Sequence, residues 1–167
     1  MDAERSADPA ATTFNVLFVC TGNTCRSPMA AAIARDELER RGWQHVRIAS
    51  AGAAADPGQP ASHPAVVVME RTGIDLSTHA SQRLTRQLVD WADLILVMSP
   101  SHLAAVEDLG GVEKMALLGE FGATDPRSAA QVRDPFGAGE EVYEATLRQL
   151  RALVAASLDR LAPIVHP

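Results

Sequence analysis

The chain is poor in cysteine, and the shortage excludes two classes of protein. Cysteine occurs only as Cys20 and Cys25, both in one turn-rich segment of the 167 residues. Two cysteines so close together do not make a disulfide framework, and they fall short of the four ligands of a structural zinc ion. We therefore consider them as reactive groups.

A basic stripe and a long apolar run are also missing. The formal net charge is -6, and basic residues are scattered among acids, which argues against nucleic acid as a partner. No apolar run approaches the ~20 residues that cross a bilayer, and the polar first residues do not look like a secretory signal. We expect a cytoplasmic protein that binds neither nucleic acid nor a membrane.

The remaining composition suits one globular domain. Hydrophobic residues make up 47% of the chain and charged residues 22%, enough for a sizeable single core. We expect a flexible N-terminal tail over residues 1–13 and a single domain over residues 14–167.

Apolar periodicity predicts strands and helices that alternate along the chain. The expected strands cover residues 14–19, 46–49, 93–98 and 114–118. The expected helices cover 28–41, 63–72 and 100–109, and a final helix follows a long loop over 121–139. This alternation predicts an α/β fold, with a four-stranded parallel sheet, helices on both faces, and ligands beyond the carboxyl ends of the strands.

The segment VCTGNTCRSP, over residues 19–28, joins the first strand to the first helix. A loop in this position points its backbone amides at one spot, where the helix dipole favours negative charge. We therefore predict an oxyanion site, with Gly22 allowing a tight turn. Its expected binding residues are Thr21, Gly22, Asn23, Thr24 and Cys25.

The two residues that flank this loop carry a nucleophilic side chain and a positively charged side chain. Cys20 ends the strand, and Arg26 can offer its planar guanidinium to two oxygens of a phosphate. Such positive surroundings favour an ionised sulfur at Cys20, which can attack phosphorus and form a phosphocysteine. Ser27 can donate a hydrogen bond to that sulfur, and the chemistry needs no metal or other cofactor. A cysteine that merely fills the core is the alternative.

This pattern resembles the low-molecular-weight protein tyrosine phosphatase family, whose signature is a cysteine, five residues and Arg-Ser-Pro in a first strand-to-helix turn. The resemblance covers the chain from about residue 15 to the final helix. It implies that Cys20 is the nucleophile, that Arg26 binds the phosphate, and that Ser27 supports the thiolate. It also implies that the side chain of Asn23 holds the loop open.

The family supports that asparagine with a serine from a Ser-Ala-Gly turn and with a later histidine. These match Ser50 and His79 in this chain. The other four histidines are then expected to be surface or packing residues, namely His45, His63, His102 and His166.

A general acid is needed as well, and Asp-Pro occurs four times, at Asp8, Asp56, Asp125 and Asp134. The long loop before the last helix favours Asp125 or Asp134, because it returns to the active-site edge of the sheet. The family's Asp-Pro-aromatic element matches Asp134 and Phe136, which implies that Asp134 is the acid and that Phe136 contacts substrate. Asp125 stays the alternative.

The substrate is suggested by what the loop contains and lacks. The family's tyrosine phosphatases usually carry a bulky apolar residue where this chain has Thr24, and tyrosine beside the acid where it has Phe136. Aromatic residues make up only 4% of the chain. The three remaining candidates, Trp43, Trp91 and Tyr143, are expected on or beside helices rather than at the loop.

The string CTGNTCRSPMA together with DPFG resembles the bacterial protein arginine phosphatase branch of the family. A hydroxyl at Thr24 can hydrogen-bond a guanidinium or position water, whereas a branched alkyl chain favours a ring edge. We predict a protein phosphatase acting on phosphorylated protein side chains, with phosphoarginine favoured and phosphotyrosine the alternative.

Other functions stay open at this point. A non-catalytic anion-binding or redox-sensing module could use the same loop. An arsenate reductase would need a further cysteine pair, and the sequence has no cysteine after Cys25. Cys25 itself could form a reversible disulfide with Cys20 under oxidation, or simply pack the loop.

Overall fold

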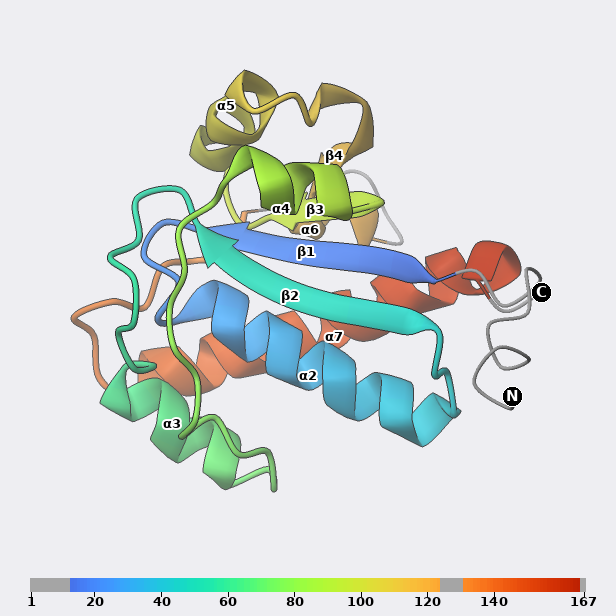
Figure 1. Cartoon of the computed structure of the whole chain (residues 1–167). Helices are drawn as coiled ribbons and strands as arrows, with labels where there is room; N and C mark the ends of the chain where they lie inside the picture. The colour runs from blue at the N-terminus through green and yellow to red at the C-terminus, as the bar shows by residue number, and fades with distance from the viewer. Residues whose placement is uncertain (1–12, 124–130, 166–167) are drawn as a thin grey trace, which may run out of the picture.

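Four parallel strands form one sheet in the order β2-β1-β3-β4. The computed structural model describes residues 13–123 and 131–165 (Figure 1), so the tail expected over residues 1–13 lies outside it except for residue 13. The strands are β1 (Phe14–Cys20), β2 (Val46–Gly52), β3 (Leu94–Val97) and β4 (Met115–Leu117).

Helices cover both faces of this sheet. Figure 1 shows α2, α3 and α7 on one side and α4 and α5 on the other. The helices are α2 (Arg26–Arg41), α3 (His63–Glu70), α4 (Arg86–Trp91), α5 (Ser101–Asp108), α6 (Leu118–Phe121) and α7 (Glu140–Val165), with a short 3-10 helix η1 (Val112–Lys114). The predicted α/β class, with a four-stranded parallel sheet and helices on both faces, is confirmed.

Alternate residues of β1 divide the core into two layers. Val16 and Phe18 belong to the cluster that also holds the buried side chains of α2 and α7. Leu17 and Val19 belong to a second cluster, with buried side chains of α4 and α5. Because β1 is apolar on both faces, it must lie inside the sheet rather than at its edge.

Several element boundaries differ from the prediction. The first helix begins at Arg26 rather than at residue 28, and the second strand continues past residue 49 to Gly52. Helix α4 was missed because its six residues are too few to show a period, although Thr85 caps it by accepting a hydrogen bond from the backbone N–H of Leu88. The long loop begins only after α6, which ends at Phe121.

The strand order determines where a ligand can bind. Strand β1 has β2 on one side and β3 on the other, so the chain leaves the sheet in opposite directions at this point. Ligands of open α/β sheets bind at such a switch point, beyond the carboxyl ends of the strands. Cys20 ends β1, and Met98 and Ser99 directly follow β3 at the same edge.

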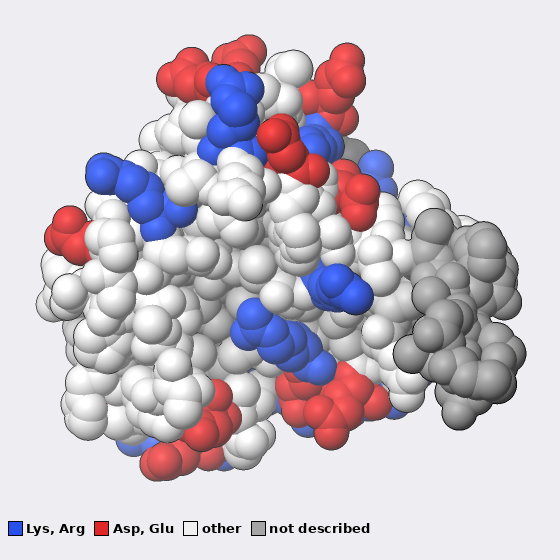
Figure 2. All heavy atoms as spheres, viewed as in Figure 1, with Lys and Arg blue, Asp and Glu red and all other residues white. Residues whose placement is uncertain are grey.

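Charged side chains on the face seen in Figure 2 are of both signs, and the basic ones do not gather into a stripe. Nothing in the structure tests nucleic acid binding, so its absence stays a prediction. Within residues 13–123 and 131–165 no helix is long and apolar enough to cross a membrane.

The end of β2 packs directly against the loop that follows β1. Cys20 lies opposite Gly52 in the register of the two strands. A Cβ atom at Gly52 would lie 2.5 Å from the carbonyl oxygen of Thr21 and 2.9 Å from the backbone nitrogen of Asn23. Only glycine therefore allows the two segments to approach so closely.

We predict that Gly52→Ala destabilises the protein and distorts the loop, because the added methyl group meets backbone atoms that cannot rotate away. The free energy of unfolding is expected to fall by about 2 kcal/mol. Gly139→Ala is the control, since a Cβ there has no atom within 4 Å and the residue has no positive φ. Chemical denaturation measures both variants, and equal stabilities would contradict the prediction.

Candidate active site

The loop after β1 turns at an asparagine. Asn23 has a φ of 57°, the only positive φ of a residue other than glycine within the described ranges. Asparagine tolerates this left-handed conformation better than most residues do. The expectation that Gly22 provides the turn was wrong in this respect. A Cβ at Gly22 would meet only Thr24 Oγ1, at an ordinary 3.7 Å.

The side chain of Asn23 is fully buried and bonds to three segments of the chain. Its Nδ2 donates to Ser27 Oγ at 2.8 Å and to Ser50 Oγ at 2.9 Å, and its Oδ1 accepts from the backbone N–H of Gln82 at 2.9 Å. His79 Nε2 lies 2.7 Å from the carbonyl oxygen of Asn23. The structure thus places Ser50 and His79 around Asn23 and adds Gln82, whose backbone contact has no sequence signal.

The sulfur of Cys20 lies inside this network. Ser27 Oγ is 2.9 Å from Cys20 Sγ, and the backbone N–H of Asn23 donates to the same sulfur at 3.3 Å. Ser27 Oγ accepts a hydrogen bond from Asn23 Nδ2, and its own hydroxyl can donate to the sulfur at 2.9 Å or to the carbonyl oxygen of Ala51 at 3.4 Å. When the hydroxyl donates to the nearer sulfur, two donors stabilise negative charge there.

Arg26 is buried in the first turn of α2 with 4% of its surface exposed. Its Nη1 donates to Ser99 Oγ at 3.0 Å and to the carbonyl oxygen of Val132 at 3.2 Å. Its Nη2 lies 3.6 Å from Asp134 Oδ2. The guanidinium is therefore held between the end of β3 and the segment that carries Asp134.

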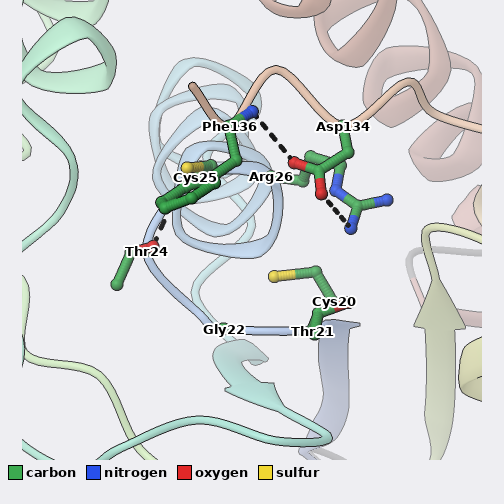
Figure 3. A pocket seen from close by; sticks show the side chains of 8 residues that line it. All are labelled: Cys20, Thr21, Gly22, Thr24, Cys25, Arg26, Asp134 and Phe136. Atoms are coloured by element: carbon green, nitrogen blue, oxygen red, sulfur yellow. Dashed lines mark hydrogen bonds and ion pairs between the residues drawn. The ribbon is translucent and has the colours of Figure 1, made fainter. Parts of the chain in front are cut away.

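These groups surround one cavity of about 210 Å³. Figure 3 shows the Cys20 sulfur, the Arg26 guanidinium and the Asp134 carboxylate arranged around it. Its lining residues are Cys20, Thr21, Gly22, Thr24, Cys25, Arg26, Asp134 and Phe136. The space suits a phosphoryl group, with a sulfur and a cation in its wall.

The mouth of the cavity is formed by the segment before α7. Asp134 has 53% of its side chain exposed, and Phe136 is 75% exposed. Asp134 Oδ1 accepts a hydrogen bond from the backbone N–H of Phe136 at 3.1 Å, so the two residues share one turn. The alternative acid, Asp125, lies outside the described residues.

Tyr143 lies closer to the loop than the sequence led us to expect. It is buried on α7, and its hydroxyl lies 3.2 Å from Cys25 Sγ and accepts a hydrogen bond from Ser62 Oγ at 3.1 Å. Burial raises the pKa of Tyr143 to about 12, so the phenol keeps its proton at neutral pH.

Cys20 and Cys25 are both free cysteines in this structure, and a reversible disulfide between them stays a prediction.

His102 was also underestimated, because it was expected only at the surface or in packing. Its ring bonds to Thr21 and to the backbone of Ser99. Its pKa is lowered to about 4, mainly by burial and also by the charge of Arg26, while the charge of Asp134 opposes the shift. The imidazole is therefore neutral at pH 7. No sequence motif pointed to it, although it closely follows the end of β3.

The other histidines differ in their surroundings. Burial lowers the pKa of His79, its bond to Asn23 opposes this shift, and Arg35 adds to it. His45 is partly buried and contacts the carbonyl oxygen of Val165, and His63 is exposed at the start of α3. His166 lies outside the described residues.

Within residues 13–123 and 131–165, no group of three His, Cys, Asp or Glu side chains is placed to hold a metal ion.

The family model described as low molecular weight phosphotyrosine protein phosphatase matches residues 15–163. The chain belongs to this family. It is accordingly a protein phosphatase, as the resemblance of its loop implied, and it acts on phosphorylated proteins.

Individual relatives match this phosphatase over most of its length. A protein-arginine-phosphatase of Geobacillus stearothermophilus is 38% identical over 152 residues, which cover 89% of this chain and 94% of that protein. A probable low molecular weight protein-tyrosine-phosphatase, EpsP, of Ralstonia nicotianae is 39% identical, covering 83% and 92%.

A solved structure extends the comparison to three dimensions. It is a mutant of the YwlE arginine phosphatase with a phosphorylated active site serine. It superposes with a TM-score of 0.84 at 35% identity, covering 90% of this chain and 97% of that one. The likeness therefore covers most of the fold of both chains.

Proposed function

We propose that this phosphatase removes phosphate from arginine side chains of proteins through a phosphocysteine intermediate. The observation that carries the substrate choice is Thr24, a small hydroxyl residue in the wall of the cavity that also holds Cys20 and Arg26. The relatives named protein-arginine-phosphatase support the same choice.

The first step joins phosphorus to sulfur. Cys20 Sγ, hydrogen-bonded by Ser27 and by the backbone of Asn23, attacks phosphorus as a thiolate. The P–N bond to the substrate guanidine breaks, and its electron pair goes to the nitrogen. Arg26 and the loop amides bind the equatorial oxygens, where charge is carried in the transition state.

Asp134 supplies and later recovers the proton. In its acid form it protonates the departing nitrogen of the arginine side chain. Its carboxylate then accepts a proton from the water that attacks the phosphocysteine, which releases inorganic phosphate and restores the thiolate. The position of Asp134 beside Arg26, at the mouth of the cavity, suits both steps.

The walls of the cavity supply substrate selection. Thr24 presents a methyl group and a hydroxyl, so it leaves room for a planar guanidinium and can hydrogen-bond it. Phe136, exposed at the mouth, offers a face on which a guanidinium can stack. A phenol could use the same face, which keeps phosphotyrosine as the second candidate.

Two further expectations belong to this proposal. The cavity contains a sulfur, a guanidinium and a carboxylate together, which favours an enzyme over a non-catalytic anion-binding module. A cytoplasmic location stays a prediction, as does the assignment of residues 14–167 to a single domain.

We expect Cys20→Ser to lower turnover of p-nitrophenyl phosphate at least 10³-fold, because a hydroxyl is a far weaker nucleophile than a thiolate at neutral pH. The variant keeps its affinity for inorganic phosphate, measured by calorimetry, since Arg26 and the loop remain. Acid quenching of the wild type during turnover is expected to trap phosphate on sulfur. Undiminished turnover in Cys20→Ser would rule the mechanism out.

Asp134→Asn tests the acid with leaving groups of different basicity. We expect kcat/KM to fall about 10²-fold for phosphotyrosine and phosphoarginine peptides, and less for p-nitrophenyl phosphate, whose leaving group needs little protonation. Asp125→Asn is the matched control and keeps its activity. Impairment of Asp125→Asn instead would move the role to that residue.

The substrate preference is tested at Thr24. We expect the wild type to favour phosphoarginine over phosphotyrosine peptides in kcat/KM, and Thr24→Ile to shift this ratio about tenfold or more towards phosphotyrosine. Thr24→Ser keeps the hydroxyl, and Thr24→Val removes it at constant shape, so the pair separates hydrogen bonding from bulk. A wild type that prefers phosphotyrosine, or a ratio unchanged in Thr24→Ile, would refute the arginine assignment.

A further inference from the structure

One buried polar side chain beside the cavity has no part in the mechanism above. His102 lies in the first turn of α5, and only 3% of its surface is exposed. It is not among the residues that line the cavity. Both of its ring nitrogens are nevertheless used in hydrogen bonds to groups that surround the phosphate site.

The hydrogen bonds of His102 determine its protonation. The backbone N–H of Ser99 donates to Nδ1 at 3.1 Å, so Nδ1 carries no proton. The single proton of the neutral ring is then on Nε2, which donates to Thr21 Oγ1 at 2.8 Å. A protonated ring would point a second donor at the N–H of Ser99.

These two bonds connect both sides of the phosphate site. Thr21 directly follows the proposed nucleophile, Cys20. Ser99 accepts a hydrogen bond from Arg26 Nη1 through its own Oγ, at 3.0 Å. One imidazole therefore holds the first residue of the loop and the turn that orients the guanidinium.

We propose that His102 is a positioning residue, which as a neutral imidazole holds Thr21 and, through Ser99, Arg26 in their orientation around the phosphoryl group. The inference rests on the proposed function, because it assigns Arg26 to the phosphate. Neutrality suits the position, since a second cation would repel Arg26, and the negative charge of Asp134 only partly opposes this effect.

Three substitutions of His102 test its hydrogen bonds to Ser99 and Thr21 separately. His102→Ala removes both. His102→Asn can still accept from the backbone of Ser99 with its side-chain oxygen, and His102→Gln can still reach Thr21 with its amide NH₂. We expect His102→Ala to lower kcat/KM for p-nitrophenyl phosphate about tenfold, the effect of losing one or two net hydrogen bonds. The asparagine and glutamine variants are each expected to recover part of this loss.

The changes in kcat and KM distinguish a positioning role of His102 from a general loss of stability. We expect kcat to fall more than KM rises, because Arg26 binds charge most strongly in the transition state. Val106→Ala, fully buried on the same helix, is the matched control, with a lower melting temperature and unchanged kcat/KM. A kcat/KM of His102→Ala within twofold of the wild type, or no recovery in either amide variant, would overturn the inference.

Two measurements do not require turnover. Nitrogen NMR of the wild type and of Cys20→Ser is expected to find the His102 proton on Nε2 at pH 7, and a proton on Nδ1 would contradict the inference. Calorimetry with inorganic phosphate is expected to give severalfold weaker binding in His102→Ala, and equal affinity would contradict it. A wild type that failed to hydrolyse p-nitrophenyl phosphate would refute the proposed function, while these two measurements would still decide the role of His102.

Discussion

The site depends on the buried side-chain amide of Asn23. Asn23 adopts a left-handed conformation that most side chains avoid, and its Nδ2 and Oδ1 then bond to Ser27, Ser50 and Gln82 from separate parts of the chain. Burying such a group without partners would cost several kcal/mol, so its hydrogen bonds hold the loop in this shape and offset the cost of the positive φ. In that shape Ser27 and the Asn23 amide are aimed at the sulfur of Cys20.

The sheet explains why three distant segments meet at this loop. Strand β1 ends at Cys20, β2 ends at Gly52 against the loop backbone, and the residues after β3 hold Arg26. Met98, also after β3, accepts a hydrogen bond from the backbone of Val132, which anchors the segment that carries Asp134. The switch point of the sheet thus places the proposed nucleophile, phosphate clamp and acid around one cavity.

Much of this arrangement was predictable because it is local in sequence. The run from Cys20 to Ser27 predicted a strand, an anion-binding loop and a helix, and the strand spacing predicted a parallel sheet. Contacts that arise only on folding were not predictable. His102 and Tyr143 approach the loop from helices far along the chain, and Gly52, rather than Gly22, is the glycine that close packing requires. Helix α4 was not predicted because six residues are too few to show the apolar periodicity of a helix.

The ion pair between Arg26 and Asp134 affects how phosphate binding is coupled to the position of Asp134. At 3.6 Å, with Asp134 half exposed, this ion pair is weak and readily exchanged. An incoming phosphoryl dianion outcompetes a single carboxylate for the guanidinium. Asp134 then loses its partner in the ion pair, and its half-exposed side chain can turn towards the leaving group at the mouth of the cavity. Binding of the phosphoryl group would thereby release the proposed acid, and departure of the product would return the carboxylate to Arg26.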